Sequence, residues 1–361
     1  MPEKTPLYDL ASQAGATFAE EAGWVVPHAY GNVGSEYDQA RLRAALFDVS
    51  HRSKVELTGG DAVTFLQNLG TNDIASLPVG AGCELFFTTA QAKVVGHAVV
   101  YHLLREDGSE ALWLDADPGQ ADKLLKHLDH YLISEQVEIT DRTREFAQVH
   151  LAGPQARQML QRALDEEVPD LAPLQHVMRT FAGDLTCQIR RHDPLGVPGY
   201  DIVCLGSRAA EVWEMLAGAG ASPAGLQAYE LLRVEAGTPV YGKDIDDNNL
   251  ALEVGRTEQA ISYRKGCFLG QEPLVRIRDL GHVNRSLTGL KLAGGERVPA
   301  GSKLFRDGKE VGWVTSSVVS PRLGTAIALA YVRRGHQEPG TALEVEAAGT
   351  RRAAEVAALP F

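Results

Sequence analysis

The hydrophobic and polar positions of this chain change their period along its length, and each period predicts an element. Leucines recur at helical spacing between residues 119 and 133, so an amphipathic helix is predicted there. Apolar and polar residues alternate over residues 54–60 and end at a Gly-Gly pair, which predicts a half-buried strand and a turn. Residues 84–104 are predicted to form a hairpin. Residues 5–46 are predicted to be mostly helical, with a loop or edge strand at 23–30.

The second half of the chain alternates helical and strand patterns before it becomes rich in short strands. Helices are predicted at 155–166, 208–219 and 229–237, and strands at 189–191 and 200–205. After these, six short apolar runs are separated by Gly and Pro, which is typical of a small β-barrel or sandwich. The pattern as a whole predicts an α+β protein with a β-rich C-terminal module. The six predicted strands cover residues 287–292, 303–305, 310–316, 326–332, 342–345 and 353–357.

Length and composition agree with a multidomain globular protein. A chain of 361 residues favours two or three domains, and 44% hydrophobic residues suffice for sizeable cores. A net charge of −12 argues against a general nucleic-acid binder, because phosphate neutralisation needs a basic surface. No apolar run reaches the roughly 18 residues of a membrane span, so no membrane contact is expected.

Cysteine usage and the N-terminal residues point to the cytoplasm. The cysteines lie far apart with no Cys-x-x-Cys pair, at Cys83, Cys187, Cys204 and Cys267. Neither a disulfide framework nor a structural zinc site is therefore expected. The N-terminal residues lack an apolar segment and carry acidic side chains, which argues against a secretory signal. We expect a reducing, cytoplasmic location and no bound metal.

The strongest candidate for chemistry is the octet Lys265-Gly266-Cys267-Phe268-Leu269-Gly270-Gln271-Glu272. Neighbouring cations stabilise a thiolate, so Cys267 is a candidate nucleophile, with Lys265 close by in the chain. Gly266 and Gly270 permit a left-handed backbone or the close approach of a ligand. Gln271 and Glu272 add an amide and a carboxylate. The alternative is a turn with a buried, inert cysteine, which is the commoner state of a free thiol.

This octet resembles the signature of the YgfZ-type folate-binding proteins. These proteins are relatives of the glycine-cleavage T-protein (aminomethyltransferase) and are linked to iron–sulfur cluster maintenance. Residues 47–51 (Phe-Asp-Val-Ser-His), residues 71–73 (Thr-Asn-Asp) and the strand around Trp313 are similar to T-protein segments. The resemblance covers roughly residues 5–361. It implies a three-domain ring, or cloverleaf, with a C-terminal β-barrel and folate in a central channel.

The domains that the resemblance implies are not all continuous in sequence. Residues 1–50 and 145–240 would together form a first, folate-binding α+β domain. Residues 51–144 would form a second α+β domain. Residues 241–285 would carry the signature loop and a connection, and residues 286–361 would form the barrel. The implied cofactor is tetrahydrofolate or a one-carbon-substituted folate.

The resemblance also implies folate contacts. Residues 199–202, which include Tyr200 and Asp201, are similar to a T-protein element whose glutamate binds the pterin ring. Arg233 matches a folate-contacting arginine, and Tyr241 lies in a matching Tyr-Gly-x-Asp-Ile stretch. From the residues alone, Asp201 could instead be an exposed aspartate at a strand end. Arg233 could instead contact a neighbouring glutamate on a solvated helix surface.

One departure from the T-protein pattern bears on activity. T-proteins place paired aspartates after the turn of the hairpin, one of them catalytic. This chain has Lys93-Val94-Val95-Gly96-His97-Ala98 at that place. A carboxylate that orients the reacting folate nitrogen and supports proton transfer has no equivalent in glycine. His97 could substitute for it, although a lone histidine on a strand is more often structural.

Two functions therefore remain open. The first hypothesis is a YgfZ-like, tetrahydrofolate-binding protein that assists assembly or repair of iron–sulfur enzymes, which would be its partners. The alternative is a folate-dependent aminomethyltransferase or another one-carbon transferase. The net charge of +3 between residues 264 and 285 suits the glutamate tail of a folate. The same positive charge would also suit a phosphate or RNA, but this segment has too few aromatic residues to indicate nucleic-acid binding.

Overall fold

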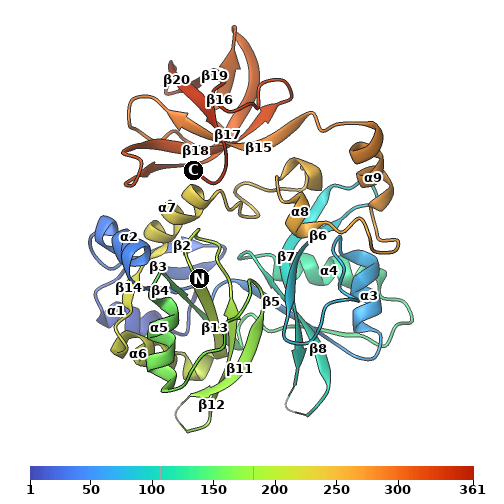
Figure 1. Ribbon diagram of the computed structural model, residues 1–361, viewed down its shortest axis with the longest axis vertical. Coiled ribbons are helices and arrows are strands. Elements are labelled where there is room, and N and C mark those ends of the chain that lie inside the picture. The colour runs from blue at the N-terminus through green and yellow to red at the C-terminus, as the bar shows by residue number, and fades with distance from the viewer. Residues whose placement is uncertain (106, 182) are drawn as a thin grey trace.

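The computed structural model describes residues 1–105, 107–181 and 183–361, which fold into three domains (Figure 1). A six-stranded sheet and a five-stranded sheet lie side by side, and a closed β-barrel lies across the top of both in this view. The predicted α+β, three-domain architecture with a C-terminal barrel is confirmed. Among the described residues, none of the helices combines the length and the apolar surface needed to cross a bilayer.

The first domain is built on the six-stranded sheet, whose order is β11-β12-β13-β10-β4-β14. Its strands are β4 (Ala45–Asp48), β10 (Phe146–Ala152), β11 (His176–Phe181), β12 (Leu185–Arg191), β13 (Gly199–Leu205) and β14 (Ser222–Ala224). Its helices are α2 (Val33–Leu42), α5 (Ala156–Leu164), α6 (Ala209–Gly218) and α7 (Leu226–Ala236). Leu46 of β4 packs into a core with α5 and α6, whereas its neighbour Phe47 packs with α2 and α7. Successive side chains of a strand point to opposite faces, so both faces of this sheet are buried.

A small N-terminal sheet with the order β1-β3-β2 belongs to the same part of the chain. Its elements are β1 (Glu3–Lys4), α1 (Tyr8–Gln13), β2 (Thr17–Glu21) and β3 (Trp24–Ala29). The prediction that residues 5–46 are mostly helical is wrong for 17–29, because β2 and β3 pair as an antiparallel hairpin. Residues 23–30, predicted as a loop or an edge strand, contain β3, which pairs with both β1 and β2 and is therefore the central strand of this sheet. The helical prediction agrees with the structure at α1 and at α2 (Val33–Leu42).

The second domain carries the five-stranded sheet, whose order is β6-β7-β8-β5-β9. Its elements are β5 (Ser53–Thr58), α3 (Ala62–Leu69), β6 (Gly82–Thr88), β7 (Val94–Leu104), β8 (Glu110–Ala116), α4 (Ala121–Tyr131) and β9 (Glu138–Asp141). Val55 and Leu57 face α3 and α4, and so do Leu85 and Phe87. The intervening residues of β6 and β7, including Glu84 and His97, therefore belong to the opposite face of the sheet.

The chain leaves the first domain through α7 and reaches the barrel by a long connection. This connection contains η2 (Ala251–Glu253), α8 (Thr257–Ala260) and α9 (Gln271–Leu280). The barrel closes in the order β15-β18-β17-β16-β19-β20 around an aliphatic core. Its strands are β15 (Arg285–Leu292), β16 (Lys303–Arg306), β17 (Lys309–Ser320), β18 (Thr325–Arg333), β19 (Ala342–Ala347) and β20 (Thr350–Ala357). Each overlaps one of the six predicted strands.

The two sheets contact each other through a mixed apolar and ionic interface. Trp113 and Tyr101 of the second domain pack with Val203 of the first. Beside them, Arg190 Nη1 of β12 lies 3.0 Å from Asp115 Oδ2 of β8, and both side chains are almost completely buried. Breaking such a pair leaves an uncompensated buried charge, so the two domains are held in one relative position. Asp115 of this interface also lines the cavity described below.

Candidate active site

A cavity of about 560 Å³ lies where the two sheets meet the start of the connection to the barrel. Its volume lies within the range of small-molecule sites, which combine apolar walls with a few placed polar groups. Its apolar wall includes Val99, Leu174 and Leu226. Its charged and polar lining comes from segments far apart in sequence: Glu21, His51, Arg52, Glu84, His97, Asp115, Asp117, His192, Asp193, Tyr229, Glu230, Arg233, Lys243 and Arg256.

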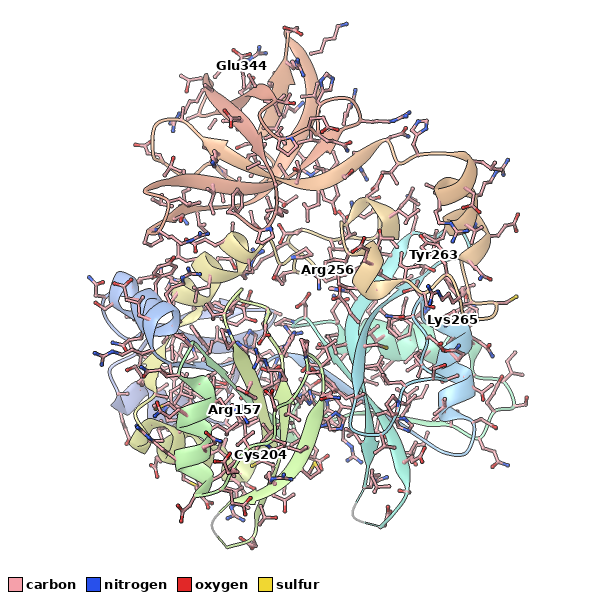
Figure 2. All side chains as sticks on the ribbon, viewed as in Figure 1. Arg157, Cys204, Arg256, Tyr263, Lys265 and Glu344 are labelled. Atoms are coloured by element: carbon pink, nitrogen blue, oxygen red, sulfur yellow. The ribbon has the colours of Figure 1, made fainter. Side chains whose placement is uncertain are left out.

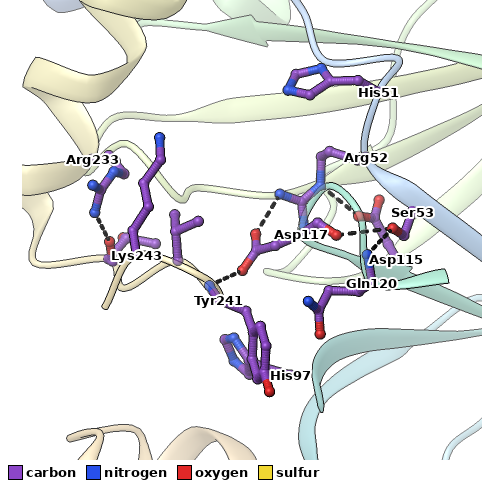
Figure 3. A network of polar contacts seen from close by, with 12 residues as sticks. His51, Arg52, Ser53, His97, Asp115, Asp117, Gln120, Arg233, Tyr241 and Lys243 are labelled. Carbon is purple, nitrogen blue, oxygen red and sulfur yellow. Dashed lines mark hydrogen bonds and ion pairs between the residues drawn. The ribbon is translucent and has the colours of Figure 1, made fainter. Parts of the chain in front are cut away.

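Arg52 joins both domains to the connection at one side of the cavity (Figure 3). Its Nε donates to Asp115 Oδ1 at 2.7 Å, and its Nη1 donates to Asp117 Oδ1 at 3.0 Å. Asp117 Oδ2 in turn accepts the backbone N–H of Tyr241 at 2.6 Å. Among the described residues, Arg52 Nη2 has no hydrogen-bond partner, so it remains a donor for a ligand.

Lys54 holds the turn between β4 and β5 in place by hydrogen bonds to its backbone carbonyls. Lys54 is completely buried, and its Nζ donates to the carbonyls of Ser50 and Arg52, each at 2.8 Å. Burial lowers the pKa of Lys54 to about 7, although the nearby Asp115 carboxylate opposes the fall. Burial also disfavours the charge of Asp115, but Arg52 and Arg190 hold the pKa of that carboxyl below its usual value. The hydrogen bond from Lys54 thus holds the backbone of Arg52 in position.

His97 and Glu84 form an imidazole–carboxylate pair on the cavity wall. His97 Nε2 lies 2.8 Å from Glu84 Oε1, and Arg256 of the connection donates from Nε to the same oxygen at 2.8 Å. The two residues come from facing strands, because Phe86 of β6 pairs with His97 of β7. Burial opposes ionisation of Glu84, yet hydrogen bonds from Arg256 and His97 lower its pKa to about 2. An ionised Glu84 can only accept a hydrogen bond, so in a neutral His97 the proton is on Nε2 and Nδ1 is unprotonated.

A second imidazole–carboxylate pair faces the cavity from the first domain. His51 Nε2 lies 3.3 Å from Glu21 Oε2, and Lys243 Nζ lies 2.7 Å from Glu21 Oε1. Against the effect of burial, these two partners lower the pKa of Glu21 to about 2. His51 Nδ1 is buried and has no partner among the described residues, and neither has the hydroxyl of Tyr229. Both are groups that a polar ligand could satisfy.

Arg233, predicted to contact folate, lines the cavity but has no donor left for a ligand. Its Nε and Nη2 donate to Glu230, its Nη1 donates to Thr238 O and Asp244 Oδ2, and its Nη2 also donates to Ser316 Oγ. These contacts use all five N–H groups of a guanidinium. Arg233 therefore ties α7 to the connection and to the barrel. The alternative contact with a neighbouring glutamate is present, but it is buried rather than solvated.

The other predicted folate contacts lie behind the cavity wall. Tyr200 is completely buried in the core of the first domain. Tyr241 packs in the connection, and its hydroxyl contacts Asp247 and Lys123. Asp201 is 2% exposed and is enclosed by two histidines, so it is not the exposed strand-end aspartate of the alternative. Direct folate contact by these three residues has no support from their positions.

The Lys265–Glu272 loop lies on the second domain, away from the cavity, none of whose lining residues belongs to it. Lys265 is near α3, whereas Arg256 lies toward the centre of the molecule (Figure 2). Lys265 Nζ donates to the carbonyls of Gln67, in the last turn of α3, and of Gly70 and Asn72, which follow that helix. These carbonyls take up the three donors of the ammonium, which gives Lys265 a structural role, and the catalytic role stays a prediction. Burial lowers the pKa of its ammonium to about 8.

The rest of the loop separates into an exposed thiol and a packed turn. Cys267 is exposed, which excludes the alternative of a buried, inert cysteine. Phe268 is buried against the connection. Gly270 has φ +83° and leads directly into α9, whose first turn contains Gln271 and the exposed Glu272. Gly266 does not have a left-handed backbone, so of the two glycines only Gly270 has the predicted conformation.

Comparison with known proteins identifies the family. The model of the GCVT N-terminal domain matches residues 7–264, and that of the glycine cleavage T-protein C-terminal barrel domain matches residues 285–361. The chain belongs to the glycine cleavage T-protein family. It is 30% identical to the aminomethyltransferase of Geobacillus kaustophilus over 365 residues, covering 100% of this chain and 99% of that protein. It is 31% identical to the aminomethyltransferase of Desulforamulus reducens over 366 residues, covering 99% and 98%.

Solved structures agree with this assignment. The crystal structure of the glycine cleavage system aminomethyltransferase T from Bartonella henselae matches with a TM-score of 0.91 and 26% identity. The match covers 100% of this chain and 98% of that one. The T-protein superfamily that the sequence indicated is thus confirmed, and the named relatives are aminomethyltransferases rather than YgfZ-type proteins.

Sequence reasoning missed most of the T-protein cavity. Two of its residues could be recognised in the sequence. His51 lies in residues 47–51, which resemble a T-protein segment, and His97 lies where T-proteins have their paired aspartates. Arg52, Glu84 and His192 carried no such signal, because each becomes part of the site only when separate domains pack together.

Proposed function

We propose that this chain is a tetrahydrofolate-dependent one-carbon transferase, with aminomethyl transfer as the first reaction to test. The observation that carries the proposal is the His97–Glu84 pair on the wall of the interdomain cavity. Relatives of nearly the same length, at 30–31% identity, are aminomethyltransferases. The proposal thus rests on a likeness to aminomethyltransferases over nearly the whole chain and on the placement of His97 and Glu84 at the cavity.

The cavity fits a reduced folate in volume and in the character of its walls. Arg52 Nη2, His51 Nδ1 and the Tyr229 hydroxyl are polar groups without partners among the described residues, and all three residues line the cavity. Aliphatic side chains such as Val99 and Leu226 offer apolar surface for a flat ring. Arg52, His51 and Tyr229 would hold the folate in this proposal. When bound, tetrahydrofolate would supply the amine nitrogens that accept a one-carbon unit.

The missing aspartate of the hairpin is replaced by a carboxylate from the facing strand. Position 96 is glycine, but Glu84 lies against His97 and is kept ionised by Arg256. The ionised Glu84 carboxylate lies against Nε2 of His97, so Nδ1 is the ring nitrogen available for proton transfer. His97 can therefore accept or release a proton at Nδ1 beside the cavity. Glu84 holds the ring and balances its charge.

The test is an assay of methylene-tetrahydrofolate formation from an aminomethyl-lipoyl carrier and tetrahydrofolate. Wild type should turn over, and His97→Ala should lower kcat by about 100-fold or more, the contribution typical of a placed acid–base group. His97→Asp, which restores a carboxylate at this position, should recover part of the loss. His282→Ala is the matched control because His282 is exposed and outside the cavity. A well-folded wild type that binds folate but does not turn over would refute aminomethyl transfer.

The exposed Cys267 favours a second candidate, a YgfZ-like role in maintaining iron–sulfur enzymes. The thiol is held at the surface by a loop that Lys265 anchors to the second domain, and neither the cavity nor a core uses it. The discriminating experiment is complementation of a bacterium that lacks its YgfZ-type protein, with activity of a [4Fe–4S] enzyme under oxidative stress as the readout. Rescue by wild type but not by Cys267→Ala would favour this role. No rescue by a well-expressed wild type would eliminate it.

A further inference from the structure

Two histidines enclose the Asp201 carboxylate just behind the cavity wall. Asp201 Oδ1 lies 2.9 Å from His150 Nδ1, and Asp201 Oδ2 lies 2.7 Å from His192 Nδ1. Resting on the function proposed above, we propose that His192 contacts the folate and that Asp201 is a positioning residue that acts through it. In this proposal the folate is contacted by His192 and not directly by Asp201.

The backbone around β13 places these three side chains together. His150 and Asp201 are direct partners in the antiparallel pairing of β10 with β13. His192 follows β12, and its backbone N–H donates to Gly199 O at 3.0 Å. A Cβ atom at position 199 would lie 2.5 Å from His192 O and 2.8 Å from His150 Cε1. A side chain at position 199 would therefore collide with the His192 backbone and with the His150 ring, so glycine lets these two segments pack against the start of β13.

Of the two imidazoles, only that of His192 can reach a ligand. The His192 side chain is 18% exposed and lines the cavity, whereas that of His150 is 1% exposed and does not. His150 Nε2 is buried and unpaired. His192 Nε2 has no hydrogen-bond partner among the described residues, but it is not enclosed by protein in the same way. The group available at this wall of the cavity is therefore His192 Nε2.

The carboxylate decides which protons the two rings carry. Burial disfavours a charge on Asp201, but the imidazoles of His192 and His150 hold its pKa well below the usual value. An ionised carboxylate only accepts hydrogen bonds, so Nδ1 is the donor in both rings. Nε2 of a neutral His192 is then an acceptor facing the cavity. Its complement is an N–H donor on a flat heterocycle, such as the amino and ring N–H groups of a pterin.

The first experiment is calorimetric titration of the full-length protein with 5-formyltetrahydrofolate. Loss of one hydrogen bond within a site should raise Kd roughly 10-fold in His192→Ala, while His192→Gln, which keeps an acceptor, should recover much of the loss. His282→Ala should bind as wild type does. If Asp201 acts through His192, adding Asp201→Asn to His192→Ala should weaken binding no further.

The second experiment measures the tautomer of His192 in the wild-type protein, first without folate and then with it. Nitrogen-15 NMR of histidine-labelled wild type reports the tautomer of each ring, and we expect His192 to carry its proton on Nδ1. Addition of 5-formyltetrahydrofolate should shift the Nε2 resonance of His192, assigned with the His192→Gln spectrum. The resonances of His282 should not change.

The outcomes separate this inference from the proposed function. Absence of folate binding by wild type refutes the proposed function, and the NMR tautomer still tests the positioning by Asp201. Folate binding with unchanged Kd in His192→Ala refutes the inference alone. Additive losses in the double variant would show that Asp201 contacts the ligand directly, and a proton on Nε2 in free wild type would show that Asp201 does not set the tautomer. Either result overturns the proposal.

Discussion

Replacing Gly270 by alanine should loosen the Lys265–Glu272 loop, whereas the same change at Gly266 should not. Gly270 has φ +83°, and a Cβ there would lie 2.4 Å from Thr88 Oγ1 and 2.6 Å from Thr89 O. Gly266 lies outside the left-handed region, and its Cβ would have no neighbour within 4 Å. The two substitutions add the same methyl group within one short loop. They are therefore a matched pair that differs only in backbone conformation and space.

The magnitude for Gly270→Ala follows from two terms. An L-residue in left-handed conformation costs roughly 1–2 kcal/mol. The new methyl group must also displace Thr88, whose Oγ1 donates to Leu269 O at 2.8 Å, and loss of that bond costs about 1 kcal/mol. With the shift forced on the Thr89 carbonyl, we expect a total of about 2–4 kcal/mol. Gly266→Ala should change stability by no more than about 0.5 kcal/mol.

Hydrogen exchange followed by mass spectrometry is the suitable assay, because it reports the opening of residues 262–275 separately from unfolding of the three domains. A loss of about 2–4 kcal/mol corresponds to exchange about 30- to 1,000-fold faster in this segment. Folate affinity should be unchanged, because no residue of the loop lines the cavity. Equal exchange in the two variants would refute the account of Gly270, and weakened folate binding would refute the separation of loop and cavity.

Three further predictions concern single side chains. Lys265→Met should lower the free energy of unfolding by about 2–4 kcal/mol, because three carbonyls lose a charged donor. Urea unfolding measures this change, and an unchanged midpoint would contradict the structural role of Lys265. The folded-state pKa of Glu84 is lowered to about 2, so its contribution to stability is complete above the unfolded value near 4.5 and is lost as pH falls towards 2. Wild type should therefore lose more stability than Glu84→Gln between pH 5 and pH 3, and parallel curves would exclude this contribution. Iodoacetamide should alkylate the exposed Cys267 in the native protein and the buried Cys187 only after unfolding, as peptide mass spectrometry can check.

The candidate site was predictable only where one short segment carries a signal of its own. The Lys265–Glu272 octet could be singled out from its residue types, and its cysteine is indeed exposed. The direction of the Lys265 side chain could not be predicted, because its three carbonyl partners lie nearly 200 positions earlier in the chain. The contacts of Arg233 beyond its own helix could not be predicted for the same reason: its partners Asp244 and Ser316 belong to the connection and the barrel.

The sequence by itself determined most of the helices and strands outside residues 17–29. Short apolar runs separated by Gly and Pro indicated the barrel strands, and leucines at helical spacing indicated α4, because the burial of a strand or of one helix face requires apolar residues at those positions. Only the tertiary structure decided the cavity. Glu84 lies against His97 because β6 and β7 pair in one particular register, and the His192 backbone and the His150 ring pack beside position 199 because it is glycine. Such contacts depend on distances between segments that are remote in sequence, and no local pattern encodes them.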